Sequence, residues 1–153
     1  MKTLVLAIGN TLLTDEGAGI HALEALQQQY PEPEGVTYMD GGTLSFTLAG
    51  AVEDADNLIV LDATQLKSEP GTVDCLINEE MDKFLGSCKR SVHEVGLLDL
   101  LDISRLTGNL PENRALVAIQ PDVIDWGEQP TEQVAAAIPV IVNKVVDLME
   151  QWA

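Results

Sequence analysis

The run Thr3–Ile8, which reads TLVLAI, is the stretch that decides the fold class. It is apolar at nearly every position, and a strand without polar alternation is typically buried on both of its faces. Gly9 interrupts the run, and helical spacing of apolar residues follows from about Asp15 to Tyr30, where Pro31 stops it. A buried strand followed at once by a helix is typical of α/β proteins, in which helices cover both faces of a parallel sheet.

The alternation of strands and helices continues along the rest of the chain. Four more runs are predicted strands, and they are Val36–Met39, Leu58–Leu61, Thr72–Ile77 and Ala115–Ile119. Three more stretches have helical spacing: a short one from Leu44 to Ala49, one that follows His93, carries Leu97–Ile103 and ends at Gly108, and a long one from Thr131 to Gln151. We therefore predict one α/β domain over residues 1–153, with a five-stranded, mainly parallel sheet sandwiched between helices.

Three local signals refine this expectation. The sequence Asp40-Gly41-Gly42 predicts a turn that closes the second strand. Thr131 is placed to cap the start of the last helix, because threonine is a favoured N-cap residue. Pro139 lies inside that helix and predicts a kink, since proline removes a backbone donor.

The charge of the chain limits its partners. Its 25 acidic residues against 8 basic ones give a formal net charge of -17. Such a surface repels nucleic acid and anionic membranes, and we expect neither as a partner. It attracts cationic peptides, basic protein surfaces and metal ions, although solubility alone would also favour it.

The cysteines and the N-terminus indicate where the protein works. Cys75 and Cys88 are the only cysteines, and they form neither a CxxC pair nor a disulfide framework. We interpret Cys75 as a buried small apolar residue rather than a nucleophile, because no histidine neighbours it in the sequence. The chain begins with an apolar strand rather than a signal peptide, and no apolar run reaches transmembrane length. We therefore expect a cytoplasmic, soluble protein, with a monomer as the default.

Candidate functional residues follow the predicted strands, because ligands of open α/β sheets bind at the carboxyl ends of the strands. The loop after the first strand reads GNTLLTDEGAG and brings Asp15 and Glu16 to the start of the first helix. Asp62 directly follows the apolar run LIVL, and His93 precedes a helix. Two carboxylates and one imidazole make an open ligand set that suits borderline metals such as Ni²⁺ or Zn²⁺.

Each candidate also has an ordinary structural explanation. Asp15 and Glu16 could complement the dipole of the first helix, and for Asp15 this explanation is the stronger one. Asp62 is harder to explain that way, because a carboxylate beside the core loses hydration unless a cation or donors compensate it. His93 by its position alone could be an ordinary loop histidine. His21, the other histidine, is expected to face solvent.

Two other functional classes do not fit the motifs. The glycines of the first loop make neither GxGxxG nor GxxxxGK[ST], and Asp15 and Glu16 would stand where a phosphate should bind. The sequence has no GxSxG motif of a serine hydrolase. A nucleotide-binding protein and a serine hydrolase are therefore both disfavoured.

Taken in order, these segments resemble the nickel–iron hydrogenase maturation endopeptidases. The resemblance is carried by GNTLLTDEGAG, by DGGT at Asp40–Thr43, by LIVLDA at Asp62, by SVHEVGL around His93, and by LTGNLP before the fifth strand. It implies a five-stranded twisted sheet between helices, and an enzyme that removes a C-terminal extension from a hydrogenase large-subunit precursor after nickel insertion. The precursor would then be the partner.

The resemblance also assigns residues. Glu16, Asp62 and His93 become the catalytic, metal-binding set, which senses nickel carried by the precursor, so no permanently bound cofactor is expected. Asp40, Gly41 and Gly42 become candidates for substrate contact. Whether nickel activates the scissile carbonyl or a water, or serves only as an anchor, stays open. Two other functions also stay open: a non-enzymatic nickel chaperone for the precursor, and a generic metal-dependent peptidase.

Overall fold

The computed structural model describes residues 1–31, 33–42, 48–87 and 92–153, and for residues 92–95 it describes the backbone only. Its elements in chain order are β1 (Thr3–Ile8), η1 (Thr14–Gly17), α1 (Ala18–Gln29), β2 (Val36–Gly42), α2 (Ala49–Asp54), β3 (Asn57–Ala63), β4 (Val73–Ile77), α3 (Glu79–Ser87), α4 (Val92–Leu106), β5 (Asn113–Ile119) and α5 (Glu132–Gln151). The expected helix from Leu44 to Ala49 falls mostly outside the described residues.

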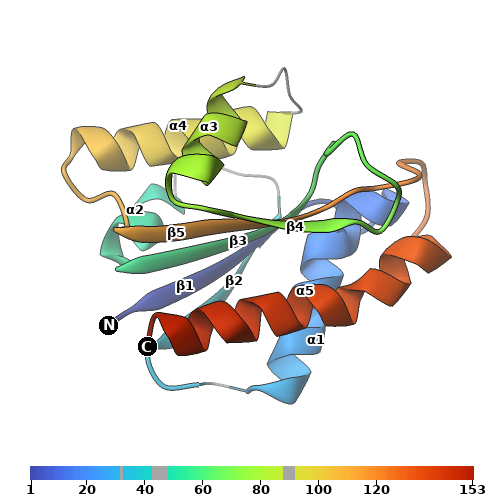
Figure 1. Cartoon of the computed structure of the whole chain (residues 1–153), viewed down its shortest axis with the longest axis horizontal. Helices are drawn as coiled ribbons and strands as arrows, with labels where there is room; N and C mark the ends of the chain where they lie inside the picture. The colour runs from blue at the N-terminus through green and yellow to red at the C-terminus, as the bar shows by residue number, and fades with distance from the viewer. Residues whose placement is uncertain (32, 43–47, 88–91) are drawn as a thin grey trace.

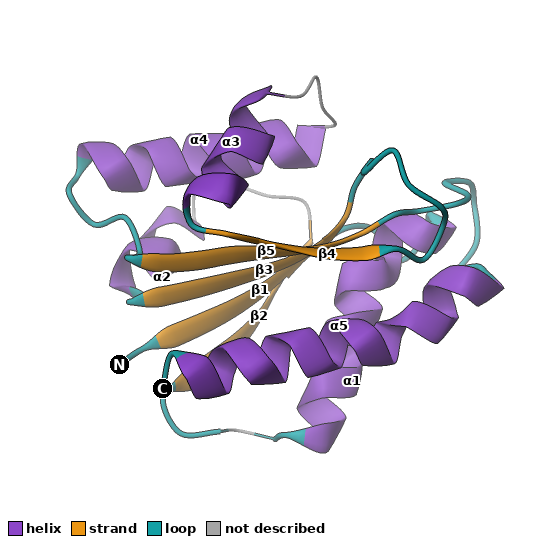
Figure 2. Cartoon of the chain, in the orientation of Figure 1, coloured by secondary structure: helices purple, strands orange, loops and turns teal. Residues whose placement is uncertain are grey.

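The strands form one five-stranded sheet in the order β2-β1-β3-β5-β4. β2, β1, β3 and β5 are mutually parallel, whereas β4 pairs with β5 in the antiparallel direction. The sheet twists from one edge to the other between two layers of helices (Figures 1 and 2). The predicted α/β fold with a mainly parallel sheet is therefore confirmed.

Each strand of the sheet interior divides its side chains between two cores, which explains why these runs are apolar without alternation. Val5, Ala7, Ile59 and Leu61 pack against α1 and α5 in one cluster. Their neighbours along the strands face the layer of α2, α3 and α4, and they are Leu4, Leu6, Ile8, Leu58 and Val60. The four parallel strands end at one edge of the sheet, which we call the carboxyl edge.

The structure corrects three local expectations. Asp40, Gly41 and Gly42 do not form a turn but continue β2, where a register shift places Gly42 opposite Ile8. The helix expected from Asp15 begins as the 3-10 helix η1 and becomes α-helical only at Ala18. α3 was not predicted, because its sequence EEMDKFLGS is mostly polar and buries only Met81 and Leu85.

The last helix has the predicted length, but its predicted N-cap hydrogen bond is absent. α5 is one helix with Pro139 inside it, and Thr131 occupies the N-cap position. The Thr131 hydroxyl accepts no capping hydrogen bond from the backbone of α5, and it donates instead to Asp15 Oδ2 at 2.8 Å. None of the helices that the structure describes is both long enough and apolar enough to cross a bilayer.

Candidate active site

Glycines press the first loop onto the carboxyl edge. Gly9 has a φ of +139°, and a Cβ at this position would lie 2.1 Å from the carbonyl oxygen of Glu16. A Cβ on Gly19 would lie 2.5 Å from the carbonyl oxygen of Leu61. Only residues without a side chain allow such close backbone approaches. The glycines that fail every nucleotide-binding motif therefore serve to pack η1 and the start of α1 against the ends of β1 and β3.

This packing brings together the two elements that carry the predicted carboxylates. Asp62 is the second-to-last residue of β3 and is 2% exposed. η1, which carries the half-buried Glu16, contacts β3. The carbonyl group that touches Gly19 belongs to the residue just before Asp62. Glu16 and Asp62 therefore belong to one region of the carboxyl edge, as the sequence predicted.

The third predicted ligand is placed only through its backbone. His93 lies in the first turn of α4. α4 leads directly into the start of β5 and runs antiparallel to it, so its first turn lies toward the carboxyl edge (Figure 1). The side chain of His93 is outside the described part of the structure. Its contact with Glu16 and Asp62 stays a prediction.

The donor types suit a borderline metal, since two carboxylates and an imidazole supply oxygen and nitrogen and leave coordination positions for a second molecule. Among the described residues, no group of three or more His, Cys, Asp or Glu side chains could hold a metal ion. The His93 side chain is not among these residues, so the set of Glu16, Asp62 and His93 stays a prediction.

The segment from Asp40 to Gly42 borders the same loop. Gly9 N donates to Gly42 O at 3.1 Å, and the exposed Asp40 accepts a hydrogen bond from Gly42 N at 2.8 Å. A Cβ on Gly41 would lie 2.9 Å from a methyl group of Leu6, so this glycine is packed against β1. The segment is therefore beside the candidate site, and its role in substrate contact stays a prediction.

Asp15 has a role that the sequence did not reveal. It is fully buried, and its carboxylate accepts hydrogen bonds from the backbone N–H of Asp122, Val123 and Thr131 at 2.6–3.0 Å, and from the Thr131 hydroxyl. Burial raises the pKa of Asp15, but these hydrogen bonds outweigh it and leave the pKa below its ordinary value of 3.8. Asp15 thus fixes the segment before α5, instead of merely complementing the dipole of its own helix.

Two further side chains, His21 and Cys75, do not act as candidate site residues. The His21 side chain is only 18% exposed, so the expectation that it faces solvent is wrong. Its Nε2 is buried without a hydrogen-bond partner among the described residues, and Nδ1 lies 4.0 Å from Glu24 Oε2. Cys75 is half-buried, and burial raises the pKa of its thiol, which keeps it protonated and disfavours a nucleophilic role.

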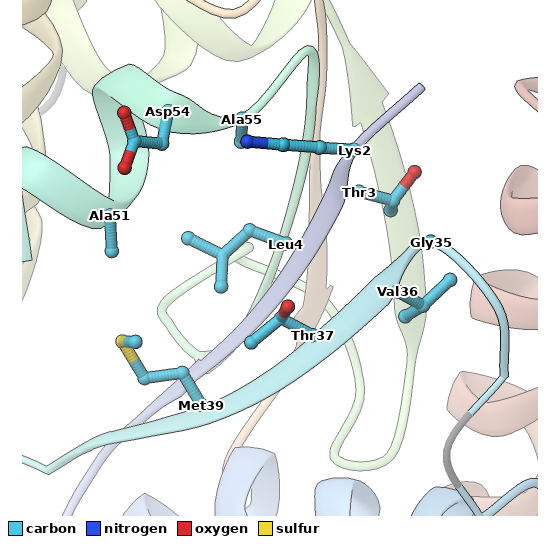
Figure 3. Close-up of a pocket in the computed structure, with 10 residues that line it drawn as sticks. All are labelled: Lys2, Thr3, Leu4, Gly35, Val36, Thr37, Met39, Ala51, Asp54 and Ala55. Carbon is cyan, nitrogen blue, oxygen red and sulfur yellow. The ribbon is translucent and has the colours of Figure 1, made fainter.

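One cavity among the described residues lies away from the predicted catalytic residues. It has a volume of about 400 Å³ and is found where β1 and β2 begin, beside α2 (Figure 3). Leu4, Met39 and Ala51 give it an apolar lining, and Lys2 and Asp54 are its charged residues. It contains none of the predicted catalytic residues, so the candidate site is the carboxyl edge and not this cavity.

Comparison with known proteins identifies the family. A family model described as hydrogenase maturation protease matches residues 20–148. The chain is 38% identical to the hydrogenase expression/formation protein HupD of Rhizobium leguminosarum over 99% of its own length and 75% of that protein. It is 37% identical to the hydrogenase 2 maturation protease of Escherichia coli over 99% and 92% of the two lengths.

Solved structures agree. The hydrogenase maturating endopeptidase HybD from E. coli superimposes with a TM-score of 0.94 at 36% identity, covering 100% of this chain and 94% of that one. The [NiFe] hydrogenase maturation protease HybD from Thermococcus kodakarensis gives a TM-score of 0.82 at 29% identity, with coverage of 97% and 99%. The chain therefore belongs to the hydrogenase maturation proteases and is a hydrolase of the endopeptidase class.

Proposed function

We propose that this endopeptidase removes the C-terminal extension of a nickel–iron hydrogenase large-subunit precursor after nickel has been inserted. The observation that supports the proposal is the contact between η1, which carries Glu16, and β3, which carries Asp62, at the carboxyl edge. The relatives indicate the substrate class, since they are maturation proteases of hydrogenases.

Nickel enters this proposal as part of the substrate. Glu16, Asp62 and His93 would contact the ion that the precursor already holds, and the positions left open by this donor set would be filled by the precursor's own ligands. A nickel-free precursor lacks that contact and would not be held for cleavage.

The test compares nickel-loaded with nickel-free precursor, with cleavage followed by the loss of mass. The wild-type protein should cut the nickel form and leave the nickel-free form intact. His93→Ala and Asp62→Asn should lower the rate by at least about 100-fold, because each removes a ligand or its charge. His21→Ala removes the other histidine and should retain most of the processing. Circular dichroism would establish that each variant is folded.

Other outcomes separate the alternatives. Equal cleavage of both precursor forms would refute nickel sensing and favour a generic peptidase. Binding of the nickel form without any cleavage would instead favour a nickel chaperone, which the family assignment disfavours. Normal processing by His93→Ala would remove that residue from the site.

A further inference from the structure

Large apolar side chains are exposed next to the candidate site. The described residues include eight large hydrophobic residues that are exposed, and four of these occur in the two loops at the carboxyl edge. They are Leu12 at 50%, Val123 at 41%, Ile124 at 56% and Trp126 at 80% exposure, and we call them the apolar rim. Exposed apolar residues that gather in this way often mark a surface for another molecule.

The two loops of the rim are joined into one unit. Gly127 N donates to Leu12 O at 2.9 Å, and Thr14 N donates to Gly127 O at 2.8 Å. The Thr14 hydroxyl donates to Val123 O at 2.5 Å and accepts from Asp125 N at 3.2 Å. These bonds place the backbone of the second loop directly against that of the first, although more than 100 residues separate them in sequence.

Asp15 ties this unit to the candidate catalytic residues. It is buried, it binds Asp122, Val123 and Thr131, and it is the residue before Glu16. A shift of the rim would therefore disturb the hydrogen bonds of a residue adjacent to Glu16. The rim is held in a fixed position beside the site.

The charge of these loops restricts what can cover the rim. Residues 9–19 and 119–131 contain no lysine or arginine, whereas the second loop carries the exposed acids Asp122, Asp125 and Glu128. A second copy of this chain would bring like charges together, on a molecule whose net charge is already -17. A partner with an apolar contact surface and basic residues around it fits better.

We propose that the apolar rim is the docking surface for the hydrogenase large-subunit precursor, which meets it with an apolar patch edged by basic residues. This inference rests on the proposed function for the identity of the partner. Tryptophan is among the residues that carry most binding energy in protein interfaces, so Trp126 should be the central contact.

The kinetic test uses Trp126→Ala and Ile124→Ser with nickel-loaded precursor. Because the rim binds substrate without touching the scissile bond, KM should rise by roughly 10-fold or more while kcat stays nearly unchanged. Leu106→Ala is the matched control, since Leu106 is 88% exposed at the far end of α4, outside the rim. It should behave as the wild type.

A second measurement follows Trp126 directly. The chain has two tryptophans, Trp126 in the rim and Trp152, which is 8% exposed. With 5-fluorotryptophan incorporated, the fluorine resonance of Trp126 should shift or broaden selectively when unlabelled precursor is added, whereas Trp152 provides the internal reference. An unshifted Trp126 resonance at saturating precursor overturns the proposal.

The outcomes distinguish this inference from the proposed function. If the wild type cleaves the nickel form but Trp126→Ala and Ile124→Ser keep its KM, the docking surface is wrong and the proposed function stands. If the wild type cleaves nothing, the proposed function fails, and a selective Trp126 shift still supports docking at the rim. A wild type that sediments as a dimer, and becomes a monomer in Trp126→Ala, would assign the rim to a second copy and refute the proposal.

Discussion

Single glycines determine how the candidate site is assembled. Gly9, with its φ of +139°, lies close to the carbonyl group of Glu16. Gly19 likewise lies close to the carbonyl group of Leu61, and neither site has room for a Cβ atom. Neither contact involves a flexible side chain that could move away. The position of η1 on the sheet therefore depends on the absence of two Cβ atoms.

Gly19→Ala tests this dependence. Its methyl group would lie 2.5 Å from a backbone oxygen, so α1 must shift, and we expect a loss of about 1–3 kcal/mol in the free energy of unfolding. Gly86→Ala is the matched control, because Gly86 is helical and, outside its own stretch of α3, no atom of the described residues lies within 4 Å of the added Cβ. This control should gain up to about 1 kcal/mol from helix propensity. Urea unfolding measures both, and equal stabilisation by the two alanines would contradict the close approach.

At the scale of elements, the sequence predicted what depends on local apolar spacing. β1 and β3 are buried on both faces, so their runs stand out, and α5 has a long apolar stripe. α3 was not predicted from the sequence, because two buried residues, Met81 and Leu85, do not make a recognisable apolar stripe. The extension of β2 through Gly42 was missed because Asp40-Gly41-Gly42 has the composition of a turn.

For the candidate site, the same limit applies. Glu16 and Asp62 were predicted because each directly follows a strand or opens a helix at an edge fixed by topology. The hydrogen bonds between Asp15 and the segment before α5 were not predicted, because they join residues up to 116 positions apart. A carboxylate in the first turn of a helix looks the same in sequence whether it faces water or binds a distant loop.

Pro139 offers a test at the same scale. It is exposed within α5, where its missing N–H leaves the carbonyl of Ala135 without the usual helical donor. Pro139→Ala should therefore stabilise the protein, by about 1–3 kcal/mol after the lost rigidity of the unfolded chain is counted. Val140→Ala, at a neighbouring exposed position, controls for the change of surface. A lower melting temperature for Pro139→Ala would mean that the packing of α5 requires the proline geometry.

For the whole molecule, the dominant property is the charge of -17. It should accelerate encounter with a basic partner at low ionic strength and prevent binding of nucleic acid. Both effects act beyond contact distance and are screened by salt over a Debye length of about 8–10 Å at moderate ionic strength.

We expect the association rate with the precursor to fall by roughly 10-fold or more between about 20 mM and about 500 mM NaCl, with a smaller change in dissociation. Stopped-flow fluorescence measures both rates. Glu128→Gln, next to the apolar rim, should reduce the salt dependence more than Glu150→Gln, an exposed acid near the end of α5. A salt-independent rate, or equal effects of the two substitutions, would argue against a basic partner at this edge.

The buried side chain of Asn57 marks where the chain ends meet. Its Nδ2 donates to Thr3 Oγ1 at 3.0 Å and to the carbonyl group of Trp152 at 3.3 Å, so the first strand and the last residues are fastened together (Figure 1). Met1 and Ala153 line one cavity there, where β1 and β2 begin and opposite the carboxyl edge. A tether to a bead or sensor surface through either end would therefore leave Glu16, Asp62 and the apolar rim turned toward solution.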